Sequence, residues 1–324
     1  MKAKTINWGI IGAGKIAEKF THDLQDLKHT RLVAISSRSQ SKAEKFASRF
    51  NIPTAYAGYD KLVKDDNIDA VYIATPHSYH CNHTKLALEQ KKAVLCEKPL
   101  AMNAIEVEDM QRSAQKNNVL LMEAMWTAFL PNYEYVKSIL DSKKLGELLH
   151  LTADFGFFTP FDTTSRLFNK ATGGGSLLDI GIYPVFLALS TMGEPEAIES
   201  KAKFFENGSD AECEMLFKYG KKTARLKSTF LKNTKTEAFF ECERGTIQLH
   251  SNFHEPTAVT VIDENNKKTY TDFKDNRLGY CHEIEHFNDL LRTSKTESPV
   301  MSFEVSQNLI KYLDMVRSKI GLEY

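Results

Sequence analysis

The sequence predicts an α/β protein in two parts, a parallel sheet wound by helices followed by a mostly antiparallel sheet. Up to about residue 124, short apolar segments alternate with helical segments, which is typical of a parallel sheet with right-handed crossovers. From Ala197 to about Ile262, short strand-like stretches are separated by turn residues instead, as in an antiparallel sheet. Because 324 residues exceed the size at which one core usually keeps growing, we expect two domains, 1–124 and 125–324.

The first strand leads into a glycine turn. An apolar run ending at Ile11 precedes Gly12-Ala13-Gly14-Lys15-Ile16-Ala17, and helical sequence follows. A dinucleotide pyrophosphate needs this geometry, because Gly12 permits the turn, Gly14 lets the backbone approach the phosphates and Ala17 allows close helix–sheet packing. The N–H groups at the helix start, around Lys15 and Ile16, then face the anion. A purely structural turn is the alternative, but a second strand begins about twenty residues later, as in dinucleotide-binding folds.

The second strand, Arg31–Ile35, ends in Ser36-Ser37-Arg38-Ser39. An NAD-selective site usually has an acidic residue here for the ribose 2′-hydroxyl, whereas a 2′-phosphate prefers hydroxyl donors and arginine. Ser37 and Arg38 therefore favour NADP as the cofactor. NAD is the alternative, with Arg38 as a solvated loop charge and Ser39 as a helix cap.

Further strands continue the parallel pattern. They are predicted at 69–74, 93–96 and 119–122, with helices at 42–50, up to 88, and at 104–117. Ligands of such sheets bind beyond the carboxyl ends of the strands. Thr75 to His80 and Glu97 to Pro99 follow two of these strands, so both segments are expected on the same rim as the glycine turn.

The second part begins after Trp126. A phenylalanine-rich strand is predicted over Leu149–Phe158, and Gly173-Gly174-Gly175 is expected to open a helix through Leu189. The other predicted elements are a helix at 132–140, strands such as 224–230 and 246–250, and helices at 280–291 and 303–320.

Composition argues against several classes of partner. Lysine plus arginine equals aspartate plus glutamate at 42 each, without one basic block, so neither nucleic acid nor an anionic membrane is expected as a partner. No uninterrupted apolar run reaches the roughly 18 residues of a membrane span. Five cysteines without a C-x-x-C pair suit free thiols. We expect a cytoplasmic protein.

Several motifs together resemble the Gfo/Idh/MocA oxidoreductases. They are the glycine turn, Ala74-Thr75-Pro76 followed by His80, Glu97-Lys98-Pro99, and the segment from Gly173 to Pro184. The last segment is most similar to the dihydrodiol dehydrogenase and NADP-linked xylose dehydrogenase branch, where tyrosine stands at a position that inositol dehydrogenases fill with histidine. The resemblance implies a Rossmann domain followed by an α/β domain with an open sheet, and a homodimer or homotetramer formed through that sheet.

The resemblance also implies roles for individual residues. Catalysis is assigned to Lys98, Asp179 and Tyr183, and nicotinamide cofactor contacts to Thr75, Pro76, His80, Glu97 and Lys98. The substrate implied is a sugar, polyol, dihydrodiol or related carbonyl compound.

The residue chemistry supports the catalytic assignment independently. Hydride transfer from an alcohol needs a base for the hydroxyl proton. Free tyrosine has a pKa near ~10 and is too weak a base at neutral pH, but a neighbouring ammonium such as that of Lys98 favours its ionised form. Asp179 and Tyr183 are four apart on a predicted helix and so share a face, where Asp179 could orient Lys98 or a substrate hydroxyl. The alternatives are a solvated lysine, a helix-capping aspartate and a half-buried tyrosine.

Substrate contacts are predicted for Trp126 and Arg166, in addition to Asp179 and Tyr183. Trp126 could instead pack at the domain junction, and Arg166 could tie down its loop. Relatives usually read tryptophan, any residue, arginine, phenylalanine where this chain has Trp126-Thr127-Ala128-Phe129, so any contact made by that arginine is missing here.

Two histidine patterns raise the question of a metal. His77, His80 and His83 recur at helical spacing, and His282 to His286 fits H-E-x-x-H. We interpret both as helix faces and predict no metal, since nothing else points to a third ligand.

The sequence thus predicts an NADP-preferring oxidoreductase. The alternatives are a catalytically silent NADP-binding sensor, which predicts loss of the proton-handling residues, and an NAD-linked inositol or polyol dehydrogenase.

Overall fold

A computed structural model describes residues 4–324, which form two compact units. Of the described residues, the first unit comprises 4–126 and 277–310, and the second 127–276 and 311–324. The expected division by a single cut after residue 124 does not include the return of 277–310. Buried polar contacts hold this segment to the first unit: Trp8 Nε1 donates to Asn288 Oδ1 at 3.0 Å, and Asp23 accepts from the N–H groups of Gly279 and Cys281.

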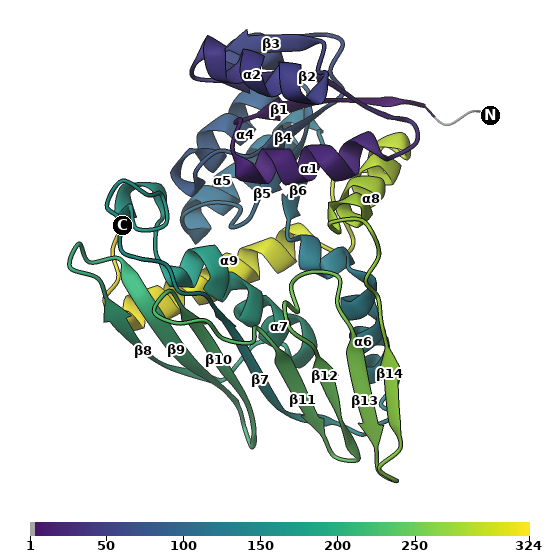
Figure 1. The fold of residues 1–324 in the computed structure, drawn as a ribbon, viewed down its shortest axis with the longest axis vertical. Coiled ribbons are helices and arrows are strands. Elements are labelled where there is room, and N and C mark those ends of the chain that lie inside the picture. Colours follow the sequence, from purple (N-terminus) through teal and green to yellow (C-terminus); the bar gives the residue numbers. More distant parts are fainter. Residues whose placement is uncertain (1–3) are drawn as a thin grey trace. The chain divides into compact units, whose positions relative to one another are not determined.

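The first unit contains a six-stranded parallel sheet with the order β3-β2-β1-β4-β5-β6 (Figure 1). Its strands are β1 (Ile6–Ile11), β2 (Thr30–Ser37), β3 (Thr54–Ala57), β4 (Ala70–Ile73), β5 (Ala93–Glu97) and β6 (Leu121–Ala124). The sequence order reverses at β1, which is where such sheets bind ligands. The predicted parallel sheet is confirmed, although the sequence analysis did not find the short strand β3.

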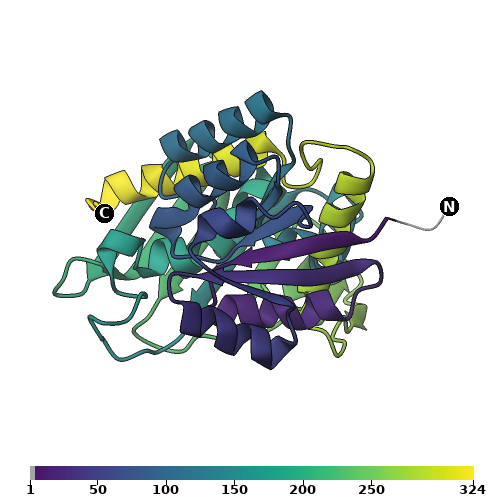
Figure 2. The same cartoon turned by 90° about the horizontal axis from the view of Figure 1, so that it is seen from above.

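Helices cover both faces of this sheet. They are α1 (Lys15–Gln25), α2 (Gln40–Phe50), α3 (Tyr59–Val63), α4 (His80–Glu89), α5 (Ala104–Asn117) and α8 (Tyr280–Arg292). Figure 2 shows α1 and α2, in purple and dark blue, on one side of the strands and the blue helices α4 and α5 on the other. This is the doubly wound arrangement predicted from the alternation of strands and helices.

The second unit contains an eight-stranded sheet with the order β14-β13-β12-β11-β7-β10-β9-β8 (Figure 1). Its strands are β7 (Leu148–Gly156), β8 (Ala197–Phe204), β9 (Asp210–Tyr219), β10 (Lys222–Thr229), β11 (Ala238–Cys242), β12 (Gly245–Leu249), β13 (Val259–Asp263) and β14 (Lys268–Thr271). Only β7 and β10 pair in parallel within this described sheet. The predicted mostly antiparallel sheet is confirmed.

Helix α7 (Ile182–Met192) packs against β7 and β10 and forms the core of the second unit. The helical stretch Lys170–Met192 is long and apolar enough, by length and composition, to cross a membrane, but 78% of its most apolar window is buried inside the protein. A core helix has the same composition, because it is surrounded by apolar neighbours. Two further helices are α6 (Pro131–Asp141) and α9 (Phe303–Ile320).

Candidate active site

The glycine turn has the form that a dinucleotide-binding loop requires. Gly12 has a φ of +106°, and a Cβ there would lie 2.6 Å from the carbonyl oxygen of Ala74, so only glycine fits. Gly14 caps α1, and a Cβ on it would meet nothing within 4 Å. Ala17 is fully buried. The residues therefore fit a pyrophosphate above the exposed Gly14, next to the first turn of α1, where Lys15 is exposed and Ile16 is half-buried.

The end of β2 carries hydroxyl and guanidinium groups and no carboxylate. The strand runs to Ser37, two residues beyond the predicted end, and the carbonyl of Ser37 accepts from the Gly58 N–H at 2.9 Å. Arg38 is exposed. Burial raises the pKa of the Tyr59 hydroxyl, and the positive charge of Arg38 partly offsets that rise. A guanidinium and a phenol thus lie near one another at this strand end.

His80 joins the loops that follow β4 and β5. The side chain is fully buried at the start of α4. Nδ1 lies 2.9 Å from the carbonyl oxygen of Pro99, and Nε2 lies 2.8 Å from that of Thr75. The structure therefore brings together the predicted segments around Thr75–Pro76 and Glu97–Pro99, because the His80 ring hydrogen-bonds to a backbone carbonyl group of each segment. Direct contact of His80 with a cofactor stays a prediction.

Glu97 and Lys98 stand at the carboxyl end of β5. Glu97 is buried, and its carboxylate accepts hydrogen bonds from the Tyr72 hydroxyl and from the Lys98 backbone N–H. Burial, together with the charge of Glu97, raises the pKa of Tyr72 well above its ordinary value. Lys98 is half-buried and precedes a cis-proline, Pro99. A predicted cofactor residue, Glu97, thus also anchors its own strand end.

In the second unit, Asp179 forms an ion pair with Arg166. Arg166 Nη1 lies 3.0 Å from Asp179 Oδ1, and the Asp179 side chain is 10% exposed against 57% for Arg166. The backbone around Asp179 differs from the prediction, because Leu177–Gly181 is a π-helical segment and the α-helix starts only at Ile182. The triple glycine is a loop directly before the helical stretch, which runs without a break from Ser176 to Met192, so the predicted position of the helix start is confirmed and its first turn is π-helical. Such π-segments often occur at functional sites.

Tyr183 lies in the first turn of α7, within an aromatic cluster that the sequence analysis did not predict. Its ring centroid lies 5.5 Å from that of Phe155 and 5.2 Å from that of His254. Phe155 belongs to the predicted phenylalanine-rich strand, but nothing local distinguishes it from its neighbours. His254 lies in a loop more than seventy positions further along the chain, and its only signal was its residue type.

Trp126 is 5% exposed and stacks on Tyr280 of α8, with ring centroids 4.3 Å apart. Its predicted contact with a substrate therefore stays a prediction. The H-E-x-x-H stretch lies on the same helix, but Glu283 is fully buried and His286 Nε2 lies 2.8 Å from Ser298 Oγ. Among residues 4–324, no three His, Cys, Asp or Glu side chains are grouped so that they could hold a metal ion.

Comparison with known proteins identifies the chain. Residues 6–125 match the family model of an oxidoreductase family with an NAD-binding Rossmann fold, and residues 133–248 match the GFO/IDH/MocA C-terminal domain. This chain belongs to the GFO/IDH/MocA oxidoreductase family. The two matched regions fall on the parallel and antiparallel sheets described above.

Relatives of this GFO/IDH/MocA protein include several dihydrodiol dehydrogenases. The trans-1,2-dihydrobenzene-1,2-diol dehydrogenase of Xenopus tropicalis is 36% identical over 330 residues, and that of Homo sapiens is 34% identical over 329, each covering 98% of both chains. Among solved structures, KijD10, a 3-ketoreductase from Actinomadura kijaniata in complex with NADP and TDP-benzene, superposes with a TM-score of 0.87 at 25% identity over 98% of both chains. An aldose–aldose oxidoreductase from Caulobacter crescentus shares the fold, with a TM-score of 0.89 at 20% identity over 98% of this chain and 97% of its own.

These matches confirm the predicted family, the fold class and an NAD(P)-dependent oxidoreductase activity. The individual site residues, the domain boundary, the oligomeric state and the location in the cell stay predictions.

Proposed function

We propose that this family member is an NADP-preferring oxidoreductase that transfers a hydride between nicotinamide and a carbon of a sugar, polyol or dihydrodiol. The observation that carries the proposal is the pairing of Asp179 with Arg166 beside the start of α7, where Tyr183 also stands. An exposed guanidinium and a largely buried carboxylate can hold a hydroxylated substrate next to a phenol. The dihydrodiol dehydrogenase relatives and the NADP-bound ketoreductase support this class of substrate.

The protein supplies the proton chemistry, while the nicotinamide supplies the hydride when it is bound. In the oxidative direction, the Tyr183 phenolate accepts the proton of the substrate hydroxyl while the hydride leaves the carbon that carries this hydroxyl. In the reductive direction, the phenol returns that proton to the new alkoxide. The resemblance to the family assigns Lys98 to the same catalytic group, and an ammonium beside the phenol would favour the phenolate, because an opposite charge lowers the pKa of an acid.

The preference for NADP rests on the end of β2. Ser37 and Arg38 offer a hydroxyl and a guanidinium to a 2′-phosphate, and no acidic residue stands there for a 2′-hydroxyl. We expect Arg38→Ala to lower kcat/KM for NADP at least tenfold while that for NAD changes less than threefold, since a charge-assisted hydrogen bond contributes about 1.5–3 kcal/mol. Unchanged selectivity would remove the support that Arg38 gives and favour the NAD-linked alternative.

Turnover over a panel of aldoses, inositols, dihydrodiols and dicarbonyls, run in both directions, tests the proposal. Lys98→Met and Tyr183→Phe should each lower kcat by at least a hundredfold, because each removes proton-handling chemistry, and Tyr183→Phe should leave the Kd for NADPH within threefold of wild type. Lys116→Met on the exposed side of α5 is a matched control. Tight NADPH binding by wild type with no turnover on any substrate would favour the sensor alternative.

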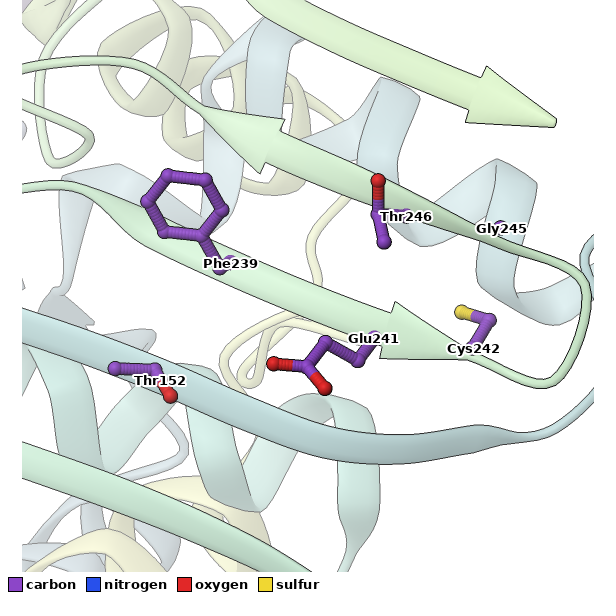
Figure 3. A pocket seen from close by; sticks show the side chains of 6 residues that line it. All are labelled: Thr152, Phe239, Glu241, Cys242, Gly245 and Thr246. Carbon is purple, nitrogen blue, oxygen red and sulfur yellow. The ribbon is translucent and has the colours of Figure 1, made fainter. Parts of the chain in front are cut away.

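We further propose that two copies assemble through the open face of the eight-stranded sheet. Phe239 is 38% exposed there, beside a cavity of about 670 Å³ lined by β7, β11 and β12. Figure 3 shows its ring projecting from β11 near Thr152 and Thr246 of the neighbouring strands. Aromatic side chains are enriched at the cores of protein–protein interfaces, and Phe239 would supply one to this interface.

Light scattering should give twice the mass of one chain, and Phe239→Arg should give a single chain. The same change at Phe158, which is 60% exposed outside the strands, is the control. A wild-type protein of one chain at all concentrations would contradict this assembly.

A further inference from the structure

Asp210, the first residue of β9, is fully buried and accepts hydrogen bonds from the start of the helical stretch that carries Asp179 and Tyr183. Its Oδ2 lies 2.7 Å from the Leu177 backbone nitrogen and 2.8 Å from Ser176 Oγ. Ser176 Oγ lies 2.9 Å from the hydroxyl of Ser228 on β10, so the same contact reaches a second strand. The helix start is thus fixed to the sheet by one carboxylate and two hydroxyls.

Glycines on the helix side allow this close approach. A Cβ on Gly175 would lie 1.9 Å from Asp210 Oδ1, and the residue has a φ of +133°. A Cβ on Gly181 would lie 3.0 Å from Ser228 Oγ. Gly175 and Gly181 therefore have different neighbours, and Gly175 is the one that makes room for the carboxylate.

The position of the contact connects it to the proposed proton chemistry. Leu177 begins the π-helical segment, and its anchored N–H lies two residues before Asp179 and six before Tyr183. A carboxylate at the amino end of a helix also interacts favourably with the helix dipole. Any change at Asp210 should therefore move or loosen the backbone that carries both side chains.

We propose that Asp210 is a positioning residue, whose buried carboxylate holds the Asp179–Tyr183 segment in its reactive conformation. It touches neither reacting atoms nor substrate and acts through the Leu177 N–H and the Ser176 hydroxyl. This role rests on the proposed function for its catalytic consequence, but the anchoring itself can be measured without turnover.

The charge on Asp210 gives the anchor a pH dependence. Burial raises the pKa of Asp210 to about 6, although the Ser176 and Leu177 hydrogen bonds favour the ionised form. Tyr324 and Cys213 are the titratable groups coupled electrostatically to Asp210, and Tyr324 is coupled in turn to Asp179 and Arg317. Near neutral pH the carboxylate is ionised and the contacts are charge-assisted, whereas below about pH 6 they become neutral and weaker.

Asp210→Asn tests the proposal, because the amide keeps the shape and one acceptor but removes the charge. We expect its kcat to be about fivefold below wild type at pH 8 and equal to wild type at pH 5, as a neutral hydrogen bond is roughly half as strong as a charged one. The Kd for NADPH should not change. Asp263→Asn, at the last residue of β13, is the control, since Asp263 also accepts backbone hydrogen bonds but lies outside the helix contacts.

Hydrogen exchange of the peptide covering 173–184 gives a readout besides activity. Asp210→Asn should speed exchange of this peptide at pH 8 by at least fivefold relative to wild type, whereas the control variant Asp263→Asn should exchange at the wild-type rate. Unchanged exchange, or a kcat ratio that does not vary with pH, would overturn the positioning role even if Tyr183→Phe abolishes turnover. If Asp210→Asn exchanges faster than wild type but the wild-type protein turns over no substrate, the anchoring role is kept and the proposed function is rejected.

Discussion

Substituting alanine for each glycine of the first turn should separate stability from cofactor binding. At Gly12, the φ of +106° is unfavourable for any residue with a Cβ, which costs on the order of 1–3 kcal/mol. The new methyl would also lie 2.6 Å from the Ala74 carbonyl oxygen, a backbone atom that cannot rotate away, so overpacking adds about 1–3 kcal/mol. Gly12→Ala should therefore lower the free energy of unfolding of the first unit by about 2–6 kcal/mol.

Gly14→Ala should change stability little but weaken NADPH binding. Its φ of −103° suits alanine, and no atom lies within 4 Å of the added Cβ. The cost at this N-cap position is about 0.5–1 kcal/mol at most. If a pyrophosphate approaches this backbone, however, the methyl should weaken NADPH binding by about 10- to 100-fold, equivalent to the loss of one hydrogen bond to a charged group.

Urea denaturation and NADPH fluorescence titration of both variants measure the two effects. The reasoning is refuted if Gly14→Ala binds NADPH as tightly as wild type, or if Gly12→Ala unfolds at the same urea concentration as wild type.

Three further predictions concern other parts of the chain. Trp8→Phe removes the buried donor to Asn288 and part of an indole, so urea denaturation should show a free energy of unfolding about 2–4 kcal/mol lower than that of wild type. A decrease below about 0.5 kcal/mol would show that the hydrogen bond to Asn288 does not hold α8 in place. Burial raises the pKa of Glu123 to about 7 from 4.5, so the contribution of this group to the free energy of unfolding is fully present below pH 4.5 and falls by up to about 3 kcal/mol as pH rises towards 7; urea titrations of Glu123→Gln should lack this component of the pH dependence, and identical slopes in the two proteins would contradict it. Arg166→Ala removes the ion pair with Asp179 and should lower kcat/KM for substrate about tenfold with unchanged NADPH affinity, whereas weaker NADPH binding would assign Arg166 to the cofactor.

The cofactor half of the site could be predicted because its signals are local. Gly12 and Gly14 are required by the backbone conformation and by access from solvent, and both requirements depend on residues adjacent in the chain. The carboxyl ends of parallel strands meet at one edge, so Thr75 and Lys98 could be placed on a common rim from strand order alone.

Other features depend on partners that are distant in sequence. Glu97 could be read as a cofactor contact, but its hydrogen bond with Tyr72 arises only when β4 and β5 pair in the sheet. The short strand β3 and helix α3 have too few residues to show a period. His254 reaches Tyr183 through a loop whose course no local pattern encodes.

By itself, the sequence determined the fold class, the family and the turn that would hold a dinucleotide, because strand–helix alternation and glycine placement act over a few residues. Only the tertiary structure decided that 277–310 returns to the first unit, that a π-segment precedes Tyr183, and that Asp210 anchors it. These depend on how buried polar groups find partners far along the chain: an unpaired N–H or carboxylate is costly in the interior, and the folded chain alone determines which groups meet.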